Sequence, residues 1–125
     1  MSKKIVIDSG HGGEDNGASG NGIIEKDLTL KISKYMKQRF DELGIPNQMT
    51  RTEDVTLNPT DRVNKVLSFY GDGKDVIVLS NHINAGDDEF TYHYIIWLGI
   101  RTSIFELVIF MIKYTKIVIL YVIMV

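Results

Sequence analysis

Cysteine is absent from this chain of 125 residues, and only two prolines are present. Without cysteine the protein can form neither a disulfide nor a thiolate nucleophile, and a metal ion would have to be held by His, Asp or Glu. A strong charge of either sign is also missing, because the formal net charge is -2. Lysines and arginines are interleaved with acids and form no basic patch, so we expect no nucleic-acid partner.

Long apolar runs are scarce as well. The first one, Ile5 to Ile7, is too short for the core of a secretory signal, so we expect synthesis in the cytoplasm without a signal peptide. The two longest runs cover residues 107–112 and 117–125, and neither reaches the roughly 18 uncharged residues of a membrane span. Buried strands or a buried helix are one interpretation of these runs, and a membrane-associated tail is the other.

The apolar residues that are present predict alternating strands and helices. We expect strands at residues 4–7, 48–50 and 76–79, and helices at residues 27–43 and from residue 59 onward. Asn58 and Pro59 supply an N-cap and a proline at the first helical position of the second helix. This order predicts the α/β fold class, with a mostly parallel, twisted sheet flanked by helices. The expected buried stripes are Leu28, Ile32, Tyr35, Met36, Phe40 and Leu43 in the first helix, and Val63, Val66, Leu67 and Tyr70 in the second.

Two histidines follow predicted strands closely. His11 comes shortly after the first strand and His82 shortly after the third. Ligand sites in parallel sheets lie beyond the carboxyl ends of the strands, so both histidines are expected at one rim. Glu25 precedes the first helix, where an acid is by itself commonly a helix-dipole contact. Together, two histidines and one carboxylate form the ligand set of a catalytic zinc ion that keeps a position open for water.

Glycines surround the first histidine, and they suggest a loop that a ligand can approach closely. A phosphate-binding loop is the alternative, which spacing tests. The pattern Gly20-Asn21-Gly22 would need a third glycine where Glu25 stands, and Ile23 follows Gly22 where a phosphate loop has Lys. Neither phosphate-loop pattern is therefore present.

Several separated motifs resemble the zinc-dependent N-acetylmuramoyl-L-alanine amidases of the Amidase_3 class. The opening motif consists of residues 5–13, Asp15, Gly17, Ala18 and residues 20–28. The later motifs are residues 49–51 with Asp54, Leu57 and Arg62, and residues 80–85. The resemblance covers residues 4–86 and implies an amidase-like fold.

The resemblance also implies a function and a metal site. Its zinc ligands map onto His11, Glu25 and His82. The implied reaction is hydrolysis of the amide between N-acetylmuramic acid and L-alanine in peptidoglycan, so peptidoglycan is the expected partner and Zn²⁺ the expected cofactor. The expected place of action is the bacterial cell wall, in the manner of an endolysin.

Four further residues are candidates for supporting the site. Asp8 and Asn84 flank the histidines and could orient a ring nitrogen, with turn formation as the alternative. Arg51 and Arg62 match family positions, where they could contact substrate or form salt bridges that hold the loops.

The chain departs from the family pattern soon after Gly86. We expect residues 1–86 to be the N-terminal part of the catalytic domain. Residues 87–125 would be an apolar, atypical remainder from a shifted reading frame or premature end, leaving the fold incomplete at its C-terminus. The family places its general-base glutamate late in the domain, and Glu106 is the only acid beyond Glu89, although it follows His82 sooner. Two alternatives therefore stay open, an active wall amidase and a catalytically defective zinc-binding domain. The sequence does not specify the oligomeric state.

Overall fold

The computed structural model describes residues 2–20, 22–83, 105–106 and 122–124. The larger sheet has the strand order β4-β1-β5-β7-β6, and β2 and β3 form a separate two-stranded sheet. Within the described residues, no helix combines the length and apolar character that crossing a membrane requires. In chain order the elements are β1 (Lys4–Ser9), β2 (Ser19–Gly20), β3 (Ile23–Ile24), α1 (Glu25–Glu42), β4 (Asn47–Met49), α2 (Pro59–Tyr70), β5 (Val76–Asn81), β6 (Phe105–Glu106) and β7 (Val122–Met124).

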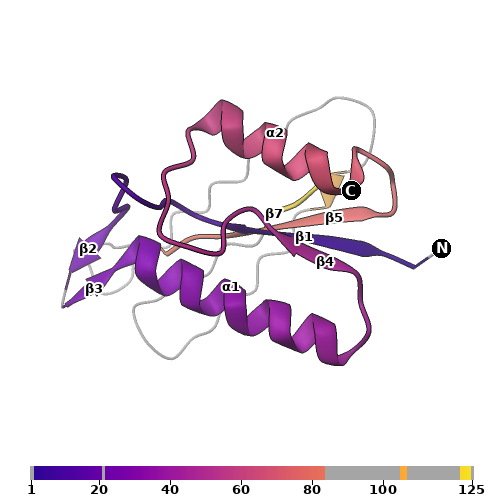
Figure 1. The fold of residues 1–125 in the computed structure, drawn as a ribbon, viewed down its shortest axis with the longest axis horizontal. Helices are drawn as coiled ribbons and strands as arrows, with labels where there is room; N and C mark the ends of the chain where they lie inside the picture. The colour runs from indigo at the N-terminus through magenta and orange to yellow at the C-terminus, as the bar shows by residue number, and fades with distance from the viewer. Residues whose placement is uncertain (1, 21, 84–104, 107–121, 125) are drawn as a thin grey trace.

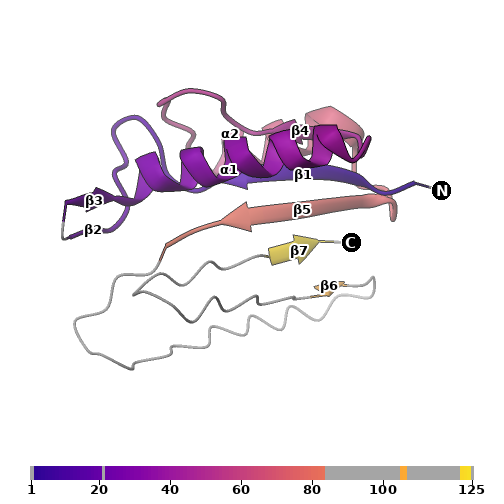
Figure 2. The same ribbon diagram turned by 90° about the horizontal axis from the view of Figure 1, so that it is seen from below.

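The sheet confirms the predicted α/β architecture. β1 pairs in parallel with β4 on one side and with β5 on the other. β7 is antiparallel to both β5 and β6, so the parallel pairing is confined to β4, β1 and β5. Figure 2 shows β1, β5 and β7 running side by side.

The two helices cover opposite faces of this sheet (Figure 1). Successive side chains of a strand point to opposite faces. Ile5 and Ile7 of β1 accordingly pack toward α1, whereas Val6 packs with Val66 of α2. The predicted flanking of the sheet by helices is therefore confirmed.

The buried face of α2 matches the predicted stripe at Val66 and Tyr70 but not at Val63 and Leu67. Val66 is buried and packs with Phe69 and Tyr70 against the sheet. Val63 and Leu67, both expected in the stripe, are 56% and 44% exposed. Spacings of three and four starting from Val66 reach Phe69 and Tyr70, so this side of the helix contacts the strands and the side carrying Val63 does not.

The first helix confirms part of the expected stripe, because Met36 and Phe40 pack against the sheet. Tyr35 and Leu43 are 64% and 63% exposed. The most buried positions of α1 are polar, namely Glu25, Thr29 and Ser33. They repeat every four residues and so share one helix face. This face lies over the polar carboxyl end of the sheet, which is why an apolar pattern could not reveal it.

The helix ends follow the predicted capping chemistry. The Asn58 side chain accepts a hydrogen bond of 2.8 Å from the backbone N–H of Asp61, and Pro59 opens α2. Gly44 and Gly71 follow the two helices with positive φ values of 67° and 72°. Glycine adopts this left-handed conformation without the steric cost of a Cβ atom, so both glycines are suited to end their helices.

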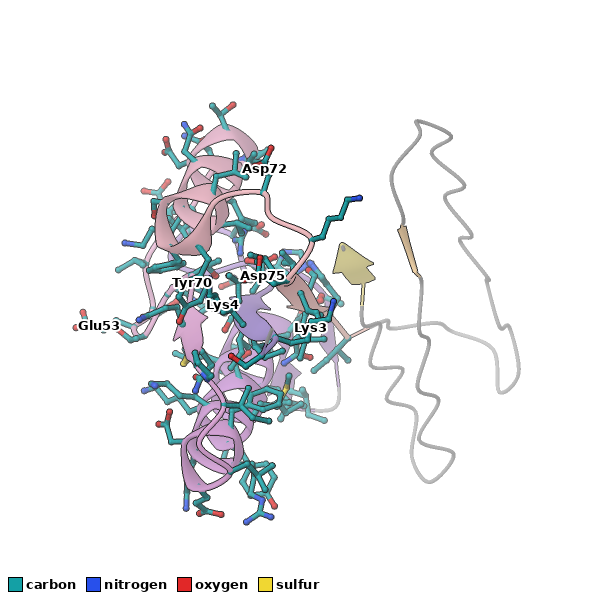
Figure 3. The ribbon with its side chains drawn as sticks, turned by 90° about the vertical axis from the view of Figure 1, so that its right-hand side faces the viewer. Lys3, Lys4, Glu53, Tyr70, Asp72 and Asp75 are labelled. Carbon is teal, nitrogen blue, oxygen red and sulfur yellow. The ribbon has the colours of Figure 1, made fainter. Side chains whose placement is uncertain are left out.

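The amino ends of β1 and β5 meet at one end of the molecule, which faces the viewer in Figure 3. The Lys4 ammonium lies 2.9 Å from a carboxylate oxygen of Asp75 and 5.8 Å from the centre of the Tyr70 ring. In the parallel register, Lys4 pairs with Val76 at this end, while Ser9 pairs with Asn81 at the other. The residues that follow both strands therefore begin at the same level, at the opposite rim.

Candidate metal centre

Three donor atoms converge at the carboxyl rim of the sheet. His11 lies in the loop after β1, Glu25 is the first residue of α1, and His82 follows β5. His11 Nε2 lies 3.1 Å from Glu25 Oε1, and His82 Nδ1 lies 3.2 Å from both of these atoms. The two imidazole rings meet edge to face. The structure thus brings together the three predicted ligands in an arrangement that could hold a metal ion.

The Glu25 carboxylate is fixed by backbone groups from two distant segments. Its Oε2 atom accepts a hydrogen bond of 2.8 Å from the N–H of Ala18, and its Oε1 atom accepts one of 2.8 Å from the N–H of Ile83. The residue is only 4% exposed. It also stands at the amino end of α1, where the helix dipole favours negative charge. These contacts direct Oε1 toward the two histidines.

The His11 ring has a carboxylate partner on its far side. Its Nδ1 atom lies 2.9 Å from Asp15 Oδ2, and Asp15 Oδ1 accepts a hydrogen bond from the N–H of Gly17. These two hydrogen bonds, that of His11 first, hold the pKa of Asp15 below its ordinary value. Asp15 belongs to the opening motif, but its contact with the His11 ring was not predicted from the sequence. The four-residue spacing from His11 through two glycines is the signal that could have revealed it, because the backbones of Gly12 and Asp15 pair and close the turn.

Two glycines make room for the site's own side chains. A Cβ atom on Gly10 would lie 2.5 Å from His82 Cε1. One on Gly17 would lie 2.5 Å from His11 Cδ2 and 2.6 Å from Glu25 Oε2. The glycines next to His11 were expected to leave room for an approaching ligand, whereas at Gly10 this room is filled by the His82 ring.

Arg51 is buried and its guanidinium donates to backbone carbonyls. It is 3% exposed, and it donates to the carbonyl oxygens of Gly10 at 2.9 Å and Lys26 at 2.8 Å. Further donations reach the carbonyls of Ser9 and Glu53. Burial lowers the pKa of Arg51. The side chain thereby connects the loop that carries His11 to the first turn of α1. Of the two roles considered for Arg51, these contacts correspond to holding the loops.

Arg62 and Asp8 hold the same loop from the other face of the sheet. Arg62 donates to Asp8 Oδ1 at 2.7 Å and to the carbonyl of His11 at 3.0 Å. Asp8 is 6% exposed and also accepts hydrogen bonds from the hydroxyls of Thr50 and Ser80. Among the described contacts, Asp8 does not touch the imidazole ring of His11. It binds Arg62, and Arg62 donates to the backbone carbonyl of His11.

A salt bridge braces the glycine loop from outside. Asp54 accepts a hydrogen bond of 2.7 Å from the N–H of Gly13, and its other oxygen lies 2.9 Å from the Lys26 ammonium. Lys26 also donates to the carbonyl of Gly13. The hydrogen bonds from Lys26 and Gly13 lower the pKa of Asp54. Asp54 belongs to one of the later motifs. Its partner Lys26 lies 28 residues away in the sequence, and spacing alone could not predict this pair.

Two predicted site residues are not tested by these contacts. Asn84 lies outside the described residues. Glu106 lies in β6, where it pairs with Ile123 of β7, and Ile123 in turn pairs with Leu79 of β5. β7 thus lies between the backbone of Glu106 and β5. The side chain of Glu106 is outside the described part, so its predicted role as a base stays a prediction.

Comparisons with known proteins agree on one family. The family model described as N-acetylmuramoyl-L-alanine amidase matches residues 5–100. The chain is 37% identical over 87 residues to the N-acetylmuramoyl-L-alanine amidase LytC of Bacillus subtilis, covering 70% of this chain and 17% of that protein. It is 39% identical over 99 residues to the endolysin of Bacillus phage SPP1, covering 76% of this chain and 35% of the endolysin.

A solved structure supports the same conclusion about the fold. The N-acetylmuramoyl-L-alanine amidase AmiC2 of Nostoc punctiforme superposes with a TM-score of 0.59 at 32% sequence identity. The match covers 69% of this chain and 46% of that one. The chain thus spans less than half the length of each of these three relatives.

Proposed function

Because this chain belongs to the N-acetylmuramoyl-L-alanine amidase family, we propose that it hydrolyses the amide bond between N-acetylmuramic acid and L-alanine in bacterial peptidoglycan. In this proposal His11, Glu25 and His82 hold a zinc ion, and the cell wall is the place of action. The observation that carries the proposal is the convergence of these three donors at one rim of the sheet. The names of the relatives, amidase and endolysin, support the substrate class.

The donor set fits zinc in chemistry and in spacing. Ligand atoms that surround a tetrahedral zinc ion at about 2.0 to 2.1 Å lie about 3.3 Å from one another. The three donor atoms here are separated by 3.1, 3.2 and 3.2 Å. Two histidines and one carboxylate also leave a fourth position for water, as catalytic zinc sites do.

The chain's own residues prepare the site for this reaction. When bound, zinc supplies polarisation of the amide carbonyl and a water molecule of lowered pKa. Glu25 is held in place by the N–H groups of Ala18 and Ile83. The side chains of His11 and His82 are 23% and 39% exposed, whereas that of Glu25 is 4% exposed. We therefore infer that the substrate approaches from the side of the two rings.

Metal content and wall digestion together test the proposal. Purified wild-type protein should bind one zinc ion, and His11→Ala or Glu25→Gln should lose it. Glu42→Gln is the matched control, because Glu42 lies at the far end of the same helix and its carboxylate pairs with Arg39. Zinc-loaded wild type should release L-alanine amino groups from peptidoglycan, and a strong chelator should stop the release. New reducing sugar ends without new amines would contradict the proposed reaction.

The general base needs its own experiment. We propose Glu106 as the candidate, since it is the only acid beyond Glu89, although it follows His82 sooner than the family's glutamate does. Under saturating zinc, Glu106→Gln should bind the metal like the wild type but lose hydrolysis. Unchanged hydrolysis in this variant would exclude Glu106. Zinc binding without hydrolysis in the wild type would instead favour the catalytically defective domain.

A further inference from the structure

We propose that Asp15 is a positioning residue that fixes the His11 imidazole with its proton on Nδ1 and its free electron pair on Nε2, directed at Glu25 and His82. The inference rests on the proposed function in one respect, namely that Nε2 receives a metal ion. The orientation of the ring itself follows from contacts in the structure.

The contact between Asp15 and His11 requires a proton on Nδ1. A neutral imidazole carries one N–H donor and one acceptor nitrogen, and an ionised carboxylate can only accept. Asp15 Oδ2 lies 2.9 Å from His11 Nδ1. The proton must therefore reside on Nδ1 for this hydrogen bond to form. Glu25 Oε1 lies 3.1 Å from Nε2 and is also an acceptor, so in the metal-free protein the two carboxylates compete for the ring proton. A cation held between Nε2, Glu25 and His82 requires Nε2 without a proton, and Asp15 then keeps the proton on Nδ1.

Asp15 is itself held in place, although its side chain is 62% exposed. Its second carboxylate oxygen accepts a hydrogen bond of 3.0 Å from the N–H of Gly17. Its backbone N–H and carbonyl both pair with Gly12, at 3.1 and 2.9 Å. Backbone hydrogen bonds thus hold Asp15 in a short turn, and the N–H of Gly17 holds its carboxylate. The carboxylate is therefore already in place to orient the His11 ring.

Steric contacts limit the alternative ring orientations. Gly17 lies so close to the His11 ring that even a Cβ atom would collide with ring carbons Cδ2 and Cγ. The His11 backbone has a φ of 58°, in the left-handed region, so the start of the side chain is set by an uncommon backbone conformation. Asp15 on one side and Gly17 on the other together define the plane and direction of the ring.

The second histidine provides a built-in comparison. His82 presents Nδ1 to the donor cluster, not Nε2. Among the described residues, its other nitrogen has no hydrogen-bond partner comparable to Asp15. If Asp15 acts on the ring that it touches, removing its carboxylate should change His11 directly, and any change at His82 should follow from the 3.2 Å contact between His82 Nδ1 and His11 Nε2.

Zinc affinity is the first test, measured by competition with a chelator of known affinity. Loss of a carboxylate partner from a metal-bound histidine typically weakens metal binding by about 10-fold to 100-fold. We expect this increase in Kd for Asp15→Ala. A smaller increase is expected for Asp15→Asn, whose amide oxygen can still accept from Nδ1. Glu14→Ala is the matched control, because Glu14 is the neighbouring exposed acid in the same loop, and it should bind zinc like the wild type.

The tautomer of His11 is the second test, measured by ¹⁵N NMR of the metal-free protein at a pH where both imidazoles are neutral. The wild type should show a population of His11 protonated on Nδ1. In Asp15→Ala, where only Glu25 faces the ring, this population should fall in favour of protonation on Nε2. An unchanged zinc Kd or an unchanged His11 tautomer in Asp15→Ala would overturn the inference. If the wild type binds no zinc, the proposed function fails, and the tautomer measurement alone decides whether Asp15 orients the ring.

Discussion

The two ends of the central sheet use similar polar contacts in different surroundings. At the carboxyl rim, Arg51 and Asp8 are 3% and 6% exposed, and among their partners Ser9, Gly10 and Thr50 are buried as well. At the amino end, the side chains of Lys4 and Asp75 are 38% and 19% exposed (Figure 3). A buried polar group that loses its partner keeps the cost of desolvation, whereas water replaces a lost partner at the surface. The stability of the rim, and with it the metal site, should therefore depend on single contacts in a way that the amino end does not.

The largest effect should come from Arg51→Met, which keeps much of the side-chain length but removes the donors. Several buried carbonyls, including those of Gly10 and Lys26, would lose a partner. We expect the free energy of unfolding to fall by about 3 to 5 kcal/mol, measured by urea denaturation. Arg51→Lys should lie between this variant and the wild type, because an ammonium cannot reproduce the planar fork. A loss below about 1 kcal/mol for Arg51→Met would show that the remaining donors, Thr29 to the Gly10 carbonyl and Arg62 to the Ser9 carbonyl, are enough to hold the rim.

A smaller effect is expected from Gly10→Ala. The new methyl group would lie 2.5 Å from His82 Cε1, so the ring or the strand end must move. Overpacking of this kind costs about 1 to 3 kcal/mol, and displacement of His82 should also weaken zinc binding. Gly20→Ala is the matched control, because no atom lies within 4 Å of the corresponding Cβ position. Equal unfolding free energies and equal zinc Kd values for the two variants would contradict the close packing at the rim.

Asp8→Asn should cost less again, because the shape of the side chain is retained. The substitution removes the charge opposite Arg62 and places an amide between the hydroxyls of Thr50 and Ser80. We expect a loss of about 1 to 2 kcal/mol in the free energy of unfolding. Thermal and urea unfolding should agree on its sign. A stabilised variant would show that the desolvation penalty of burying the Asp8–Arg62 ion pair exceeds the attraction between the two charges.

The smallest effect belongs to the amino end and depends on pH. Hydrogen bonding to Lys4 lowers the pKa of Asp75 from its ordinary value of 3.8. A group with a lowered folded-state pKa stabilises the protein above its unfolded-state pKa, and this contribution is lost as pH falls through the folded-state pKa. Asp75→Asn should thus be slightly less stable than the wild type at neutral pH. The two proteins should converge as pH falls below 3.8, which acid unfolding curves at several pH values will show.

Much of the fold was predictable because local chemistry and hydrophobic periodicity determine it. The short apolar run of β1 and the Asn58 cap of α2 depend on neighbouring residues, and both were found from the sequence. The buried faces of the helices were harder. Thr29 and Ser33 are buried over Asn81, a contact across 52 and 48 residues, and no apolar period signals a polar interface.

The candidate site likewise has a part that was predictable from the sequence and a part that was not. The convergence of His11 and His82 follows from a rule about parallel sheets and needs no side-chain detail. The contacts that hold them in place were not foreseen, because they depend on loop conformations. Asp15 reaches the His11 ring only through a turn that two backbone hydrogen bonds close, and Arg51 meets Gly10 across 41 residues.

The separation of the three donors along the chain has a consequence for the order of folding. His11 and His82 are 71 residues apart, so a long segment must be closed before their nitrogens can meet. Closing such a segment costs chain entropy that no local contact repays, which delays the step until β1 and β5 have paired. A folding chain would then acquire its metal late, after the parallel strands have assembled. Bound metal would in turn slow the separation of those strands, because it adds its binding free energy only to the state in which they are paired.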